Sequence, residues 1–370
     1  MIIRMPDNYK QFHCIADRCQ HTCCAGGWEI GVDDQTYDDY CEVGGEFGKR
    51  LMRSIKKDDH PHFLMKHGKC PFLGKDHLCE IYKQLGEESL GTVCTEYPRF
   101  DVEYEETREK SLSLSCEEVG RLLFSRKDKI TFLEQELKGT EPFAHHKNTE
   151  AIVKARDYCI SLLQDRKSNL KTRLLSILEF GVSVQNLLND NGFDKVDQPI
   201  TEHAKKEIIH TRKLANKERH ALFQKRMDLM MEMEVMEEEW IQQMNNVMRA
   251  FYSSDQYERT SAMFSEYMDG REHEYEHLLV YFIYRYLVKA VEDDEFLNRL
   301  KFCVVCYLTI RDMDRMRFLI QGMSFTMEDR IDTARIFSKQ VEHSQKSMEY
   351  LLEKVANEEV FLTEALASQL

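Results

Sequence analysis

The sequence has no apolar run long enough to cross a membrane. Its longest stretches, Leu278 to Tyr284 and Phe302 to Ile310, fall well short of the roughly 20 residues that a membrane helix needs. The first residues, Met1 to Pro6, also lack the apolar core of a secretion signal. We therefore expect a cytoplasmic protein that does not use a membrane as its partner.

An excess of positive charge is absent as well. The 370 residues include 51 Lys and Arg against 65 Asp and Glu, which gives a formal net charge of −14. Nucleic acids and anionic membranes bind clustered Lys and Arg, so this balance argues against both as main partners. The acidic surplus suits a cationic partner such as a lysine-bearing polypeptide, although it also serves solubility alone.

Two motifs of cofactor-binding enzymes are missing. Doubly wound α/β enzymes have a glycine-rich turn directly after a strand, whereas several glycines here lie near Cys24 and Trp28 and strand patterns are scarce. Radical S-adenosylmethionine enzymes use Cys-x3-Cys-x2-Cys, but Gly26 stands where a third cysteine should follow Cys19 and Cys23. An enzyme that uses S-adenosylmethionine would therefore need an unusual scaffold here.

Cysteine is the residue that the sequence has in excess. There are twelve, and nine of them lie within the first 116 residues. In a reducing compartment this number favours metal ligation or redox chemistry over disulfides. The same region contains four of the six prolines and the pair Gly26-Gly27, so we expect a loop-rich fold with short helices around a ligand site.

Eight of these cysteines are spaced closely enough to converge on a metal. They are Cys14, Cys19, Cys23, Cys24, Cys70, Cys79, Cys94 and Cys116. Sulfur ligands suit an iron–sulfur cluster or zinc, and the absence of any Cys-x2-Cys in this region favours iron–sulfur, with zinc as the alternative. Since one cluster needs about four thiolates, either two centres form or about half of the eight are structural. The adjacent Cys23 and Cys24 are not expected to ligate the same ion.

The other cysteines and several polar residues have simpler interpretations. Cys159, Cys303 and Cys306 lie on apolar helical faces and are predicted to be core residues, and Cys41 is incidental. Arg99 and Arg108 are candidates to bind a cofactor carboxylate or to stabilise cluster charge, and a surface salt bridge is the alternative for each. His13 and His21 flank the first cysteines as ligands, second-sphere donors or bystanders.

After Phe124 the sequence has helical periodicity. Apolar faces recur in 152–163, 170–178, 203–250, 272–292, 295–320 and 326–356. The methionines between Met227 and Met248 are predicted to pack in the core, with the acids of 232–239 interleaved along a long charged helix. We predict a mainly α protein with two domains: an irregular cysteine-rich metal-binding module over residues 1–124 and an all-α helical bundle over residues 125–370.

Several segments resemble the flagellin lysine-N-methylase family. In the N-terminal part the similar segments are Phe12 to Cys14 with Cys19, Cys23-Cys24, Trp28 to Ile30, Cys70 to Leu73, Leu78 to Tyr82, Cys94 to Arg99 and Ser111 to Cys116. In the helical part they are Glu276 to Leu279, Tyr284-Arg285 and Val341 to Ser344. The family usually has Pro and an Ala-Ala pair after the last cysteine, where this chain has Glu117 to Gly120.

The resemblance implies methyl transfer from S-adenosylmethionine to lysine side chains of flagellin, with an iron–sulfur centre held by the eight cysteines. A lysine ammonium, with a pKa of about 10.4, must lose its proton before it can attack a methyl group, so the site needs desolvation or a base. Tyr97 and Glu96 are the nearest candidates for that base. The alternative is a non-enzymatic metal-binding or redox-responsive interaction protein, and the sequence does not give the oligomeric state.

Overall fold

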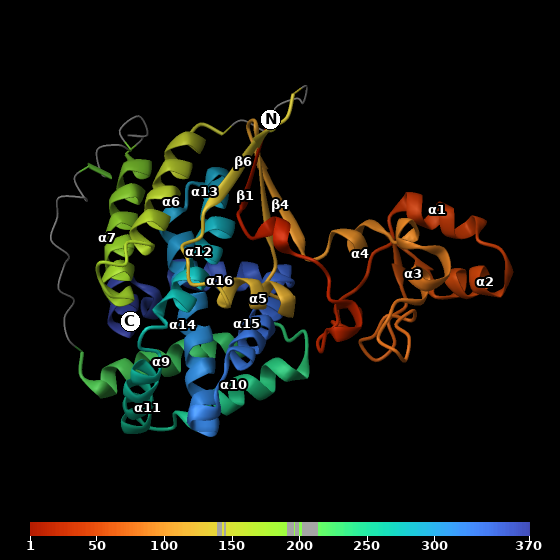
Figure 1. Ribbon diagram of the computed structural model, residues 1–370. Coiled ribbons are helices and arrows are strands. Elements are labelled where there is room, and N and C mark those ends of the chain that lie inside the picture. The colour runs from red at the N-terminus through yellow and green to blue at the C-terminus, as the bar shows by residue number, and fades with distance from the viewer. Residues whose placement is uncertain (139–142, 144–145, 191–195, 197–199, 202–213) are drawn as a thin grey trace.

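The computed structural model spans residues 1–370 and describes all of them except 139–142, 144–145, 191–195, 197–199 and 202–213 (Figure 1). The described part of the chain is mainly α-helical, as predicted, with a four-stranded and a two-stranded sheet. Among the described helices, none is both long and apolar enough to cross a bilayer.

Residues 14–97, called the cysteine module below, form a lobe that projects from the rest of the protein in Figure 1. Its elements are η2 (Ala16–Arg18), η3 (Cys23–Ala25), α1 (Asp34–Glu42), α2 (Gly45–Arg53), β2 (Ile55–Lys57), β3 (Pro61–Phe63), α3 (Glu80–Leu85), η4 (Glu87–Ser89) and α4 (Thr92–Glu96). A small apolar cluster of its own includes Ile30, Tyr40, Leu51, Phe63 and Phe72. The short helices and loops of this lobe agree with the loop-rich fold that was predicted for the cysteine-rich region.

A four-stranded sheet joins the chain on either side of the cysteine module. Its strands are β1 (Ile2–Pro6), β4 (Arg99–Tyr104), β5 (Thr107–Leu112) and β6 (Phe132–Glu136), in the order β4-β5-β1-β6. β1 is parallel to β5 and antiparallel to β6, with Ile3 opposite Arg108 on one side and Gln135 on the other. This sheet was not predicted from the sequence, in which strand patterns are scarce.

The helical body consists of this sheet, η1 (Tyr9–Gln11), α5 (Glu117–Phe124) and the helices that follow. These are α6 (Thr149–Leu163), α7 (Leu170–Asn189), α9 (Asn216–Met231), α10 (Glu238–Ala250), α11 (Ser254–Tyr267), α12 (Glu272–Tyr286), η6 (Leu287–Lys289), α13 (Ala290–Asp293), α14 (Phe296–Gln321), η7 (Gly322–Ser324), α15 (Met327–Glu342), α16 (Gln345–Asn357), η8 (Glu359–Phe361) and α17 (Thr363–Gln369). α14 is buried over most of its length and packs against α7, α10, α12, α15 and α16. Cys303 and Cys306 on α14 and Cys159 on α6 are fully buried, so their predicted role as core residues is confirmed.

The long charged helix predicted across 203–250 was wrong for the part that is described. α9 ends at Met231 and α10 begins at Glu238, and residues 232–237 between them are not helical. Residues 202–213 lie outside the described part of the chain. Acids near the break are already paired, because Glu237 contacts Lys339 at 2.5 Å and Glu239 contacts Arg335 at 3.1 Å.

The methionine stripe packs inside the protein, as predicted. Met227, Met230, Met233 and Met244 are almost completely buried in the large apolar cluster of the helical body. Their spacing on α9 and α10 places the flexible thioethers between neighbouring helices, where they fill the core. Met231, by contrast, faces outward.

The large apolar cluster also includes residues that precede the predicted domain boundary. Phe12, Tyr104, Leu112 and Leu114 are buried in it together with the helices that follow residue 124. The division between the two apolar clusters therefore falls near residues 13 and 98.

A buried ion pair connects strand β5 of the sheet to helix α6. The guanidinium of Arg156 on α6 donates to Glu109 on β5 through two bonds of 2.5 and 2.8 Å, and both side chains are almost fully buried. Tyr104 donates a further 2.7 Å bond to Glu109. Removal of the guanidinium would leave the buried carboxylate of Glu109 with the Tyr104 hydroxyl and with the more distant cation Arg4, at 3.6 Å.

We predict that Arg156→Met lowers the free energy of unfolding by about 3–5 kcal/mol, the usual cost of an unpaired buried charge. Urea denaturation followed by circular dichroism measures this loss. Lys154→Met on the same helix is the control, because Lys154 is half-exposed in its pair with Glu150 and should change the free energy by less than about 1 kcal/mol. Equal losses in the two variants would contradict the role given to the buried pair.

Candidate metal centre

Three of the eight candidate cysteines are brought together by backbone hydrogen bonds inside the cysteine module. The N–H of Cys70 donates to the carbonyl of Cys24 at 2.7 Å. Leu73, three residues after Cys70, pairs with Cys79 across an isolated β-bridge. All three cysteines pack in the apolar cluster of the module. The main chain, rather than the side chains, therefore sets their mutual positions.

Cys94 on α4 completes this first set. Asp33 accepts a 3.0 Å hydrogen bond from the N–H of Thr92, which holds the start of α4 against α1. The pKa of the Cys94 thiol is raised to about 12, first by desolvation of the thiol and then by the nearby Cys24, Cys70 and Cys79. We call Cys24, Cys70, Cys79 and Cys94 the inner group.

A second set lies where the module meets the helical body. Cys116 immediately precedes α5, and the carboxylate of Glu117 accepts 3.1 Å hydrogen bonds from the N–H groups of Gln20 and His21. These bonds hold the loop that contains Cys19 against the start of α5. Burial raises the pKa of Cys19 to about 12, and Glu117, Cys116 and Cys14 add to the rise.

Cys23 stands between the two sets. A hydrogen bond with Cys24 is the largest cause of its raised pKa, followed by burial and the influence of Cys14 and Cys94. The same bond lowers the pKa of Cys24 to about 7, because it stabilises the Cys24 thiolate. Since adjacent cysteines are not expected to serve one ion, we assign Cys23 to the second set. We call Cys14, Cys19, Cys23 and Cys116 the junction group.

The cysteine sulfurs do not form a tight cluster at zinc spacing. Among the described residues, no three of them lie within 4.8 Å of one another. Sulfurs on one zinc ion lie about 3.8 Å apart, since each Zn–S bond is about 2.3 Å long, so zinc would need these thiols to move closer. All twelve cysteines are free thiols. Two separate groups of four soft ligands fit iron–sulfur clusters by number and by chemistry.

The candidate cations differ in their relation to these groups. Arg99 donates to the carbonyl of Thr95 on α4 at 3.3 Å, which places it beside the helix of Cys94. Arg108 lies near the far end of the β4–β5 hairpin and pairs with Glu103 at 2.6 Å, with Asp101 close by. The structure therefore brings Arg99 toward the cysteines and does not bring Arg108.

The two flanking histidines also differ. The ring of His13 is exposed and lies 3.0 Å from the carbonyl of Gln11. The Nε2 atom of His21 lies 3.5 Å from Asp332 on α15, so this residue contacts the helical body. His21 thus belongs to the contact between the two parts of the protein.

Tyr97 lies in a buried polar chain at the junction. Its hydroxyl is 2.9 Å from that of Ser115, which in turn is 2.7 Å from Nε2 of His343 at the end of α15. Ser113 is 3.0 Å from the same nitrogen. The ring of Trp28 stacks on His343 with 5.1 Å between centroids. Glu96, the other candidate base, is exposed and takes no part in this chain.

Next to His343, the buried carboxylate of Glu342 collects three donors. Tyr281 and Tyr286 on α12 donate to it at 2.7 and 2.6 Å, and Arg285 lies 3.3 Å away. The Tyr281 hydroxyl also accepts a bond from the N–H of Leu114. The segment 111–116 is therefore tied to both α12 and α15.

The segment from Val341 to Ser344 entered the sequence prediction only through the family resemblance, and no role was predicted for Glu342 or His343. An acid and a histidine on the buried side of a helix end were the available signal. Buried polar groups of this kind need partners, so their position predicts a hydrogen-bonded network. The partners themselves come from segments far away in sequence.

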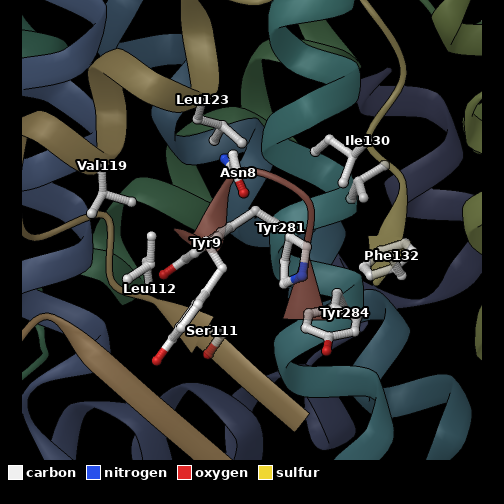
Figure 2. A pocket seen from close by; sticks show the side chains of 12 residues that line it. Asn8, Tyr9, Ser111, Leu112, Val119, Leu123, Ile130, Phe132, Tyr281 and Tyr284 are labelled. Atoms are coloured by element: carbon white, nitrogen blue, oxygen red, sulfur yellow. The ribbon is translucent and has the colours of Figure 1, made fainter. Parts of the chain in front are cut away.

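Tyr281 of this network also lines a pocket of about 30 Å³. Figure 2 shows the side chains around this pocket. Asn8 and Tyr9 line it from the N-terminal segment, and Tyr281 and Tyr284 line it from α12. Sites for cofactor-sized molecules usually measure about 300–1,000 Å³. This pocket therefore has no room for S-adenosylmethionine.

The protein is therefore of a two-part class, in which a helical body and a cysteine-rich module meet at a polar junction. Residues 156–369, most of that body, match the family model described as the FliB lysine N-methylase C-terminal domain. The chain belongs to this family, and the resemblance found in its sequence is thereby confirmed.

Curated relatives agree with the family match. The chain is 25% identical over 213 residues to the lysine-N-methylases of Salmonella typhimurium and Salmonella choleraesuis, covering 52% of this chain and 50% of each relative. It is 29% identical over 138 residues to the flagellar biosynthetic protein FliU of Salmonella muenchen, covering 35% of this chain and 81% of that protein. The chain thus spans about half the length of the two lysine-N-methylases. No solved structure matches it.

The junction predicts a pH dependence of stability. Burial lowers the pKa of His343 from 6.5 to about 4, so the folded protein holds this ring neutral where the unfolded chain would protonate it. Stability present above pH 6.5 is therefore lost as the pH falls toward 4, by about 3 kcal/mol from this residue. Urea denaturation of His343→Gln should show a smaller loss over that range than wild type. His77→Asn, at an exposed site, should keep the wild-type slope.

Proposed function

We propose that this protein is an S-adenosylmethionine-dependent lysine N-methyltransferase that acts on flagellin and contains iron–sulfur clusters. The family match over residues 156–369 is the observation that carries the proposal. The names of the relatives, lysine-N-methylase and flagellar biosynthetic protein, support the reaction and the flagellar substrate. The structure contributes a polar junction at which the matched helices meet the cysteine module.

S-adenosylmethionine supplies the methyl group, and a nitrogen–carbon bond forms while the carbon–sulfur bond breaks. The lysine must first lose a proton, because only the neutral amine has a free electron pair. Burial raises the pKa of Tyr97 well above its usual range, so this phenol stays protonated at neutral pH. Its oxygen can accept an N–H bond and orient the amine, while Glu96 at the surface remains the candidate acceptor for the proton.

The hydrogen-bond chain behind Tyr97 gives its hydroxyl a fixed direction. Ser115 and His343 hold the phenol from the side of the helical body, and Trp28 packs 5.5 Å from its ring. A neutral imidazole accepts from a hydroxyl, so His343 serves as an anchor rather than as the base. Arg99, near α4, is the cation that we propose for the carboxylate of the methyl donor. Arg108 is neutralised by its acidic partners and is a weaker choice.

Two clusters, one in each cysteine group, explain why the chain has eight clustered thiols. Three cysteines of the inner group pack on the apolar cluster of the cysteine module, and the junction group includes Cys116 at the start of α5. The neighbours Cys23 and Cys24 belong to different groups, which removes the strain of two adjacent ligands on one centre. The clusters would hold the loops 14–27 and 66–79 in place next to Tyr97.

We predict that the anaerobically purified protein is brown and contains about eight iron and eight sulfide per chain, as two four-iron clusters require. Cys19→Ser and Cys79→Ala should each retain about half of the iron, because each removes a ligand from a different group. Iron and acid-labile sulfide analysis measures this. Cys159→Ala and Cys306→Ala are controls from the helical core and should keep the full content. Colourless protein with zinc alone, or complete loss in either single variant, would overturn the two-cluster assignment.

We also predict that Tyr97→Phe slows methyl transfer to purified flagellin about 100-fold, since a misplaced amine loses the benefit of a fixed geometry. Mass spectrometry of flagellin after incubation with S-adenosylmethionine gives the rate. Tyr82→Phe is the matched control, because Tyr82 lies on α3 of the same module with half of its side chain exposed.

The same assay separates the enzyme from the alternative, a metal-binding or redox-responsive interaction protein. An interaction protein would bind flagellin or another partner without methylating it. Methylation would raise the mass of flagellin by about 14 Da for each methyl group, the mass of one added CH₂. Absence of methylation by the metal-replete wild type would therefore reject the proposed reaction and leave the cysteine assignment standing.

A further inference from the structure

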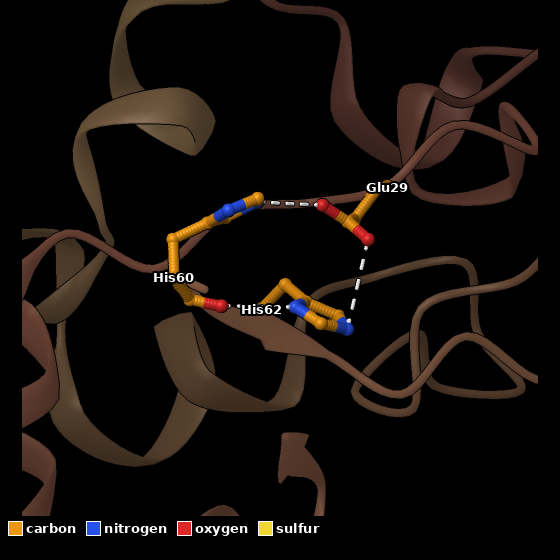
Figure 3. A group of neighbouring side chains, drawn as sticks. All are labelled: Glu29, His60 and His62. Atoms are coloured by element: carbon orange, nitrogen blue, oxygen red, sulfur yellow. Dashed lines mark hydrogen bonds and ion pairs between the residues drawn. The ribbon is translucent and has the colours of Figure 1, made fainter. Parts of the chain in front are cut away.

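Glu29, His60 and His62 form a cluster on the outside of the cysteine module, separate from both cysteine groups (Figure 3). One carboxylate oxygen of Glu29 lies 2.8 Å from Nε2 of His60, and the other lies 3.6 Å from Nε2 of His62. One ligand atom from each of the three residues falls within 4.8 Å of the others. Figure 3 shows the three side chains pointing toward one another.

The backbone builds this arrangement without help from a metal. The N–H of Phe63 donates to the carbonyl of Ile30 at 2.9 Å, and Gly31 pairs with His62 in an antiparallel bridge. His62 lies on β3, and His60 lies in the turn just before this strand. Glu29 meets them from the adjacent segment. The three donors therefore come from the β2–β3 hairpin and from the segment that pairs with it.

The histidine with the lower exposure is already oriented as a ligand. Nδ1 of His62 lies 3.0 Å from the carbonyl of His60, which places the ring proton on Nδ1 and leaves the electron pair of Nε2 directed toward Glu29. Metal-binding histidines are commonly fixed by such a bond from their second nitrogen. Asp58 lies 3.4 Å from the same Nδ1 and adds negative charge behind the ring.

The simplest reading of the cluster is a pair of surface contacts between a glutamate and two histidines. Such contacts between exposed groups contribute little to stability, so they do not explain why three donors converge. Lys56 is a nearby cation, but it pairs with Asp58 at 2.5 Å rather than with Glu29. Two neutral imidazoles and one carboxylate are a common ligand set for zinc with one open position.

The distances also fit one ion. Two ligand atoms about 2.0–2.1 Å from a tetrahedral zinc ion lie about 3.4 Å apart. The separation is 2.8 Å from one Glu29 oxygen to His60 and 3.6 Å from the other oxygen to His62, and one ligand atom of each residue lies within 4.8 Å of the others, so side-chain rotations would bring them to this spacing. We propose that Glu29, His60 and His62 bind one divalent ion of the zinc class through the carboxylate and both Nε2 atoms, with solvent in the remaining position. Any proton on Nε2 of His60 leaves to solvent when the ion binds.

The ion would connect the segment that contains Glu29 to the β2–β3 hairpin. Glu29 follows Trp28, whose ring stacks on His343 and lies 5.5 Å from Nζ of Lys339. Fixing Glu29 to β3 therefore fixes the backbone next to Trp28. The site thus stabilises the cysteine module and the position of the ring at the junction.

The test is titration of the full-length protein, purified anaerobically with its thiolate sites occupied, with Co²⁺ as a spectroscopic probe for zinc. We expect one additional Co²⁺ per chain with visible d–d absorption and no thiolate charge-transfer band, because the ligands are nitrogen and oxygen. His60→Asn, His62→Asn and Glu29→Gln should each weaken this binding at least tenfold. His77→Asn, an exposed histidine of the same module, should leave it unchanged.

A second measurement keeps the test decisive where a variant folds poorly. Zn²⁺ should raise the melting temperature of wild type and of His77→Asn, and should leave that of His60→Asn unchanged. Binding that is equal in all variants, or a cobalt spectrum dominated by thiolate bands, would overturn the proposed site. This outcome is independent of methyl transfer, because neither measurement uses flagellin or the methyl donor.

Discussion

The segment 111–116 is the constraint on which the rest of the structure depends. It leaves β5, crosses the ends of α12 and α15 and arrives at Cys116, the residue before α5. Within six residues it offers two serine hydroxyls to His343 and one N–H to Tyr281. Because these partners are buried, each bond is worth more than it would be in water, and loss of one partner leaves an unsatisfied group. These bonds fix the surface of the helical body to which Tyr97 of the cysteine module is bonded through Ser115.

The helices could be predicted from sequence because the apolar spacing and the end signals agree. Asn169 caps α7 by accepting a hydrogen bond from the N–H of Thr172, between the predicted apolar faces 152–163 and 170–178. The sheet was missed, although Phe100, Val102 and Tyr104 alternate along β4 in the manner of a half-buried strand. β5 next to it, in contrast, has mostly polar residues, and its partner β1 lies a hundred residues earlier, so local pattern alone could not establish the pairing.

The cysteine spacing predicted which residues form the candidate site but not how they divide. Cys24 and Cys70 are joined by a backbone bond between two loops, and Cys116 meets Cys19 through Glu117. Neither relation follows from spacing, because both depend on the chain leaving the helical body near residue 13 and returning near residue 98. Arg108 shows the reverse case. It lies within ten residues of Cys116 in sequence, but an extended hairpin carries it away from the cysteines.

The two parts of the protein hold their shape by different means. The helical body buries ion pairs such as Arg226 with Asp312 and Arg330 with Glu274, and these add to a large apolar core. The cysteine module has only a small apolar cluster, and a core of that size gives little stability on its own. Metal ligation is the interaction that can supply the rest, since binding to the folded state alone adds directly to its stability. Trp28 and Tyr97 belong to the module and contact His343 in the body. Under the proposed metal binding, ligands that hold the loops of the module would therefore also fix these two rings against the body.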